Sequence, residues 1–166
     1  MTAGYTVSDW TDFAIAVTAA ASTLAGLLFV AVSINLKRIL EFPSLPARAG
    51  QTLILFVTPL LVGLFLLVPG QASAVLAAEL LAAGVLIGAF QVLIDLRSVR
   101  AEQETPVTWL VSRVFPAIVT CGSMVVAAAT LLAGVGGGLY WLVPGMLAAI
   151  VFGLVNAWVL LVEILR

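Results

Sequence analysis

The sequence contains no histidine, a single cysteine (Cys121) and very few charged residues. Charged residues make up 9% of the 166 residues, whereas hydrophobic residues make up 63%. A soluble domain carries about 25% charged residues, so this chain cannot cover a water-facing surface with polar side chains. One cysteine forms neither an intramolecular disulfide nor, without histidine, a Cys/His metal cluster. The composition therefore predicts an integral membrane protein with no metal and no cofactor.

Basic patches and catalytic groups are scarce as well. The net charge is −1, and no basic stripe is interleaved with aromatic residues, which excludes a nucleic-acid partner. Hydroxyl groups such as those of Ser22 and Ser123 have neither a histidine nor an intramembrane lysine to activate them. We therefore expect no catalytic residue and no enzymatic activity.

What the chain does contain is long apolar runs. The first extends from Phe13 to Leu40, begins beside Trp10 and meets no charge before Lys37. About 20 apolar residues already cross the hydrocarbon of a bilayer, and a tryptophan at the start suits the headgroup level. Five such runs predict one all-α domain, residues 1–166, folded as a transmembrane helical bundle. The predicted helices cover residues 13–40, 47–68, 72–96, 106–133 with a bend at Pro116, and 142–165.

The basic residues indicate the orientation of this bundle. With five crossings, all seven fall on one face of the membrane: Lys37, Arg38, Arg48, Arg97, Arg100, Arg113 and Arg166. Asp9 and Asp12 lie on the other face. Because cytoplasmic loops are enriched in lysine and arginine, we expect the N-terminus outside and the C-terminus in the cytoplasm.

Glu79 is the one acidic residue well inside an apolar run. Intramembrane carboxylates are rare and often bind protons or cations. Counted from the start of its helix, Glu79 lies about 10 Å deep; counted back from the inner charges, it lies about one turn below the outer surface. The sequence leaves open an ion or proton site and a near-interface glutamate bonded to a neighbouring helix or to water.

Small residues recur at helical spacing in three of the predicted helices, and small side chains let two helix backbones approach closely in lipid. In the third helix Gly84 and Gly88 share a sector with Gln91, and Glu79 lies on the opposite side. That helix is therefore expected to be central, or to contact its own bundle on one side and another subunit on the other. The candidate helix-packing residues are Ser22, Gly26, Gly84, Gly88, Gly145 and Gly153. Their partners are helices of the same chain or of an oligomer.

Polar amides offer a second kind of helix contact. Asn35 and Asn156 both lie toward the cytoplasmic side, in the first and fifth predicted helices. Amides of this kind hydrogen-bond across helices within the membrane. We expect the two asparagines to join these helices, and Gln91 to act similarly in the third.

The first fifty residues resemble a known family. Trp10, Phe13, the run ASTLAGLLFVAVSINLKRIL at 21–40 and PSLPARA at 43–49 are similar to small bacterial membrane proteins, mostly of high-GC Gram-positive bacteria. Some of these carry the label of modulator of FtsH protease. The resemblance implies a multi-pass protein of the bacterial cytoplasmic membrane, and it supplies no catalytic residues.

These observations favour a non-enzymatic membrane protein that works through helix–helix assembly. Its partners would be the lipid bilayer and either further copies of itself or another membrane protein, as an accessory or regulatory subunit. The alternative is an oligomeric ion channel or small transporter for cations or protons, with Glu79 on the conducting surface.

Overall fold

The computed structural model describes residues 4–42, 45–98 and 114–165, and within these ranges every regular element is a helix. Five helices are long and apolar enough to cross a membrane. They are α1 (Thr11–Ile34), α3 (Leu45–Leu66), α4 (Ser73–Ser98), α6 (Phe115–Ala133) and α7 (Leu142–Leu165). A short helix α2 (Leu36–Glu41) and the 3-10 turns η1 (Val7–Trp10) and η3 (Gly138–Trp141) complete the described elements. The predicted all-helical chain with five membrane-length helices is thus confirmed.

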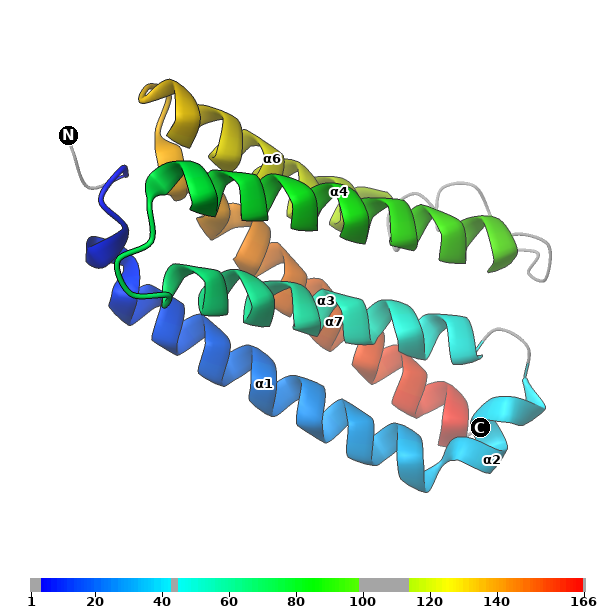
Figure 1. The fold of residues 1–166 in the computed structure, drawn as a ribbon. Helices are drawn as coiled ribbons and strands as arrows, with labels where there is room; N and C mark the ends of the chain where they lie inside the picture. The colour runs from blue at the N-terminus through cyan, green and yellow to red at the C-terminus, as the bar shows by residue number, and fades with distance from the viewer. Residues whose placement is uncertain (1–3, 43–44, 99–113, 166) are drawn as a thin grey trace.

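The helix boundaries depart from the predicted ones in two places. Asn35, with φ −103° and ψ 15°, ends α1, so the predicted 13–40 helix is two helices that change direction at this residue (Figure 1). Pro116 lies in the first turn of α6, where its missing N–H leaves no intrahelical bond unmade. Residues 106–113 of the predicted fourth helix lie outside the described residues. In α3, by contrast, the helix continues through Pro59.

The centre of the molecule is α3. It packs between α1 and α7 and also contacts α4, while α6 packs against both α4 and α7 (Figure 1). In the most apolar 18-residue window of each helix, 56% of α3 is buried, against 22% of α4 and 17% of α1. Of the two predicted arrangements of the third membrane-length helix, α4, the central one is not observed, because α3 is the more buried helix. Contact of α4 with another subunit stays a prediction.

The buried polar residues of α3 are compatible with its inner position. Thr52 and Thr58 are fully buried, and their hydroxyls donate to the carbonyls of Arg48 and Ile54 at 2.8 and 2.7 Å. Each threonine is therefore satisfied within its own helix, which lets α3 sit in a dry interior without unpaired hydroxyls. The exposed surfaces of α1, α4 and α7 instead carry large apolar residues such as Phe29, Phe90 and Val151.

The two ends of the molecule differ in character. At one end, Leu139 N donates to Gly4 O at 2.8 Å and Gly137 N donates to Tyr5 Oη at 2.9 Å, so the N-terminal segment binds the loop before α7. Trp10 is only 7% exposed and packs edge-to-face on Tyr140 at 5.0 Å. Trp10 therefore packs within the chain at this end of the molecule, and its place at the headgroup level stays a prediction. The opposite end holds α2, the start of α3 and the end of α7 (Figure 1).

Candidate functional site

Glu79 lies in the second turn of α4, about 9 Å along the helix from Ser73. Its half-buried carboxylate accepts a hydrogen bond of 2.5 Å from Nε2 of Gln71, which belongs to the turn between α3 and α4. The donor comes from the same helical hairpin, and not from a distant helix. Glu79 therefore lies near the end of the molecule that holds the α3–α4 turn, and its position along α4 is close to the one counted from the start of the helix.

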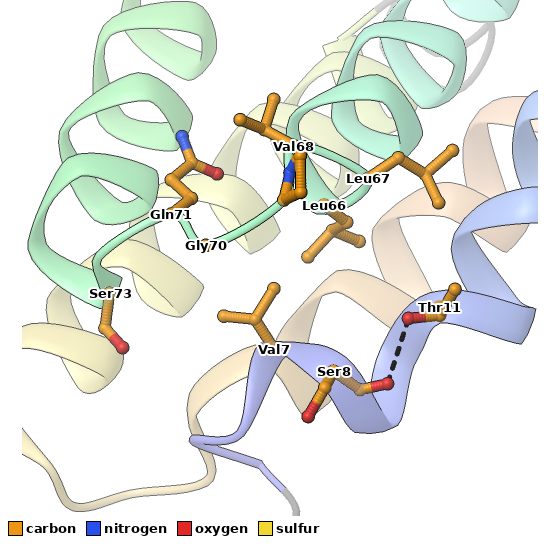
Figure 2. A pocket seen from close by; sticks show the side chains of 10 residues that line it. Val7, Ser8, Thr11, Leu66, Leu67, Val68, Gly70, Gln71 and Ser73 are labelled. Carbon is orange, nitrogen blue, oxygen red and sulfur yellow. Dashed lines mark hydrogen bonds between the residues drawn. The ribbon is translucent and has the colours of Figure 1, made fainter.

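Close to Gln71, a hollow of about 510 Å³ opens between η1 and the α3–α4 turn (Figure 2). Leu66, Leu67 and Val68 form an apolar wall, and Ser8 and Ser73 add hydroxyls. Glu79 is not among the residues that line it. The carboxylate thus faces Gln71 and does not open into this hollow.

The α4–α6 interface contains both glycines of the third predicted helix. A Cβ placed on Gly84 would lie 3.2 Å from Met124 Cβ, and one on Gly88 would lie 3.6 Å from Cys121 Sγ. Farther along the same face, Gln91 is buried, and Cys121 Sγ donates weakly to its Oε1 at 3.7 Å. Gly84, Gly88 and Gln91 therefore lie on one α4 surface that contacts α6.

The glycines of α7 lie against two different helices. A Cβ on Gly145 would overlap the hydroxyl of Ser123 in α6, and one on Gly153 would lie 2.5 Å from Phe56 Cε1 in α3. Ala149, between them, is fully buried. These residues form the α7 seam (Gly145, Ala149 and Gly153), which packs wholly within the chain.

The small residues of α1 behave differently. Nothing lies within 4 Å of a Cβ placed on Gly26, and Ser22 is exposed. The buried side of α1 consists of other residues, namely Ala14, Val17, Ala21 and Leu28. At about 100° per residue, the exposed small residues lie on the side of the helix away from α3. We call them the α1 outer stripe: Ala19, Ser22, Thr23, Gly26 and Ser33.

The two asparagines do not join α1 to α7. Asn35 Nδ2 donates to Ala31 O of its own helix at 2.9 Å, and Asn156 has no side-chain hydrogen bond among the residues that the structure describes. The reason is topological, since α3 lies between the two helices and keeps them largely apart. The prediction of an Asn35–Asn156 contact is wrong.

An ion pair that the sequence did not predict joins α3 to α7 instead. Arg48 Nη1 and Glu163 Oε1 are 2.5 Å apart, with side chains 18% and 41% exposed. Both residues occur near the basic end of a predicted helix, so an arginine–carboxylate pair could have been proposed from their shared membrane level. Their adjacency could not, because nothing in the sequence states which helices are neighbours.

Comparison of the chain with protein-family models, curated proteins and solved structures returned no match.

Proposed function

We propose that this chain is a membrane protein that self-associates through the α1 outer stripe and acts as an assembling or accessory subunit. The observation that carries the proposal is the open space at Gly26 on an exposed helix face. The other small-residue positions predicted for packing, in α4 and α7, already have partners within the chain.

Short side chains on a lipid-facing surface leave a shallow groove along the helix. The hydroxyls of Ser22, Thr23 and Ser33 donate to carbonyls of α1 itself, at 3.1, 2.8 and 2.7 Å, so a second helix can approach them without leaving a donor unpaired. Close backbone approach supports helix association in lipid, where no hydrophobic driving force acts between helices. A second copy brings an identical stripe, and a two-fold axis along α1 would pair the two surfaces.

The proposed orientation places the N-terminus outside and α2 at the cytoplasmic face of a bacterial membrane. Lys37, Arg38 and Arg48 support this, because all three lie at the end of the molecule that holds α2, and Asp9 and Asp12 lie at the other. The bacterial source still depends on the sequence resemblance.

Self-association is tested by the mass of the protein–detergent complex and by subunit counting in liposomes at low protein density. Wild type should be oligomeric, and Gly26→Leu should be mainly monomeric because the new side chain fills the groove along α1. Gly122→Leu is the matched control, since a Cβ there also meets nothing within 4 Å but lies on α6. A monomeric wild type, or an equal loss in both variants, would contradict the proposal.

Orientation needs a separate test. In a Cys121→Ser background, Asp9→Cys should react with a membrane-impermeant maleimide added to whole cells, and Glu41→Cys should react only after lysis. Both positions are exposed, so accessibility within the fold does not confound the comparison. The reverse labelling pattern would refute the orientation.

A further inference from the structure

A second hollow, of about 260 Å³, lies between α1, α2 and the first turns of α3. Apart from Gly50 at one edge, its lining consists of apolar side chains from three helices. We call it the α2 groove; its lining residues are Leu28, Phe29, Val32, Leu36, Ile39, Leu40, Pro46, Ala49, Gly50 and Leu53. It belongs neither to the α1 outer stripe nor to the surroundings of Glu79.

The groove exists because the chain changes direction at Asn35. The short helix α2 therefore stands beside the start of α3 and does not extend α1. Ile39 anchors α2 in the core with 2% exposure, while Leu36 and Leu40 line the groove and remain 50% and 67% exposed. Gly50 of α3 also lines the groove, and nothing lies within 4 Å of a Cβ placed there.

The helix that bounds this apolar groove also carries exposed charge. Lys37 and Arg38 are both exposed on α2, and the Arg38 guanidinium lies 5.8 Å from the centroid of the Phe42 ring. At about 100° per residue, Lys37 lies beside the face of α2 that carries Leu36 and Leu40, and Arg38 lies on the opposite face. An apolar face with cations beside and opposite it is typical of a helix at the boundary between lipid headgroups and acyl chains.

We infer that the α2 groove binds one acyl chain of an anionic phospholipid whose phosphate contacts Lys37 and Arg38. Pockets that enclose whole drug-sized ligands measure roughly 300–1,000 Å³. A hollow of about 260 Å³ therefore suits part of one chain, with the headgroup outside it. Lys37 and Arg38 outnumber Glu41 on α2, and this net positive charge favours an anionic headgroup, since basic residues beside a membrane-spanning helix attract acidic lipids. A second copy docked here about a two-fold axis would instead bring like charges together.

This inference rests on the proposed membrane placement of α2, but not on self-association through α1. Native mass spectrometry tests it by counting bound lipids on each protein species, so monomers and oligomers are scored separately. The probes are palmitoyl-oleoyl phosphatidylglycerol, which is anionic, and palmitoyl-oleoyl phosphatidylcholine, which is zwitterionic, each titrated from mixed micelles. Wild type should retain the anionic lipid preferentially.

Four variants separate the groove from the charges. Lys37→Gln and Arg38→Gln should each lower phosphatidylglycerol binding about fivefold and leave phosphatidylcholine unchanged. Gly50→Leu should reduce binding of the anionic lipid by filling the groove. Leu40→Gln should also reduce binding of the anionic lipid, because it places a polar side chain in the groove. Since Leu40 is exposed, this variant still tests the groove if Gly50→Leu does not fold. Gly122→Leu is the control and should bind as wild type does.

Two results would overturn the inference. One is equal retention of the two lipids by wild type. The other is undiminished phosphatidylglycerol binding in both Gly50→Leu and Leu40→Gln while the charge variants lose it, because that pattern describes adsorption to surface charge without a groove.

Discussion

Helices α1 and α7 both carry glycine among small residues at helical spacing, but only the glycines of α7 lie against other helices. Gly145 and Gly153 of α7 lie so close to α6 and α3 that a side chain on either would collide with its neighbour. A Cβ placed on Gly26 of α1 has no neighbouring atom within 4 Å. The same sequence signal thus marks an internal seam in one helix and an unoccupied surface in the other.

The difference follows from the place of each helix in the fold. Both α3 and α6 contact α7, which has neighbours on two sides, whereas α1 packs mainly on α3. The contact side of α1 uses Ala14, which lies against Gly63 of α3. Once that side is satisfied, the remaining small residues of α1 face outward. A pattern of small residues therefore indicates that another helix can approach closely. The fold determines whether that helix belongs to the same chain.

The largest effect on stability is expected from a substitution in the α7 seam. Gly153→Leu should destabilise the protein by about 2–3 kcal/mol, because the added side chain overpacks against the Phe56 ring. The measurement is detergent-solubilised thermal unfolding followed by near-ultraviolet circular dichroism. Gly26→Leu, the matched change in the α1 outer stripe, should not destabilise the isolated protomer, because nothing lies within 4 Å of the added Cβ. Equal destabilisation by the two variants would remove the contrast between the helices.

Disulfide cross-linking between two copies tests whether the α1 outer stripe is a contact surface. In a Cys121→Ser background, Ser22→Cys and Gly26→Cys should form dimers under mild oxidation, because the outer stripe is expected to meet its own copy. Ala21→Cys should not, since Ala21 is fully buried on the opposite side of α1. Band intensities on non-reducing gels provide the measurement. Dimers that form as readily from Ala21→Cys would count against the stripe as the contact surface.

A smaller effect is expected at the Arg48–Glu163 pair, which joins α7 to α3 by charge and not by close packing. Arg48→Met and Glu163→Gln should each lower the unfolding free energy by about 1 kcal/mol, because the partly exposed pair is screened by water. The double variant should lose less than the sum of the two single losses. Strict additivity in this thermodynamic cycle would mean that the pair contributes nothing.

The smallest effect concerns Glu79 and the channel alternative. Because its carboxylate is bonded to Gln71 within one hairpin, Glu79→Gln should leave cation flux into reconstituted liposomes unchanged. The readout is a cation-sensitive dye trapped in the vesicles, with protein-free vesicles as the control. Flux carried by wild type and lost in Glu79→Gln would revive the channel function and make Glu79 its key residue.

Some features could be predicted from residue types alone. The membrane class, the five long helices and most of their ends follow from runs of apolar residues that end at charges or at proline. Gly70 and Gly134, which follow α3 and α6, both adopt φ of +67°, a conformation that glycine reaches more readily than other residues. These properties depend on a residue and its close neighbours in the chain, so a single sequence suffices to predict them.

Other features depend on which helices are neighbours, and the chain does not encode that locally. Trp10 suited a headgroup position as well as a core, and only the fold packs Tyr140 against it. Asn35 and Asn156 matched in depth but not in adjacency, because α3 lies between their helices. In lipid, apolar surface is nearly equally favourable against a tail or a helix, so hydrophobicity does not select neighbours. Close contacts such as Gly153 against Phe56 make that selection, and these arise only in the tertiary structure.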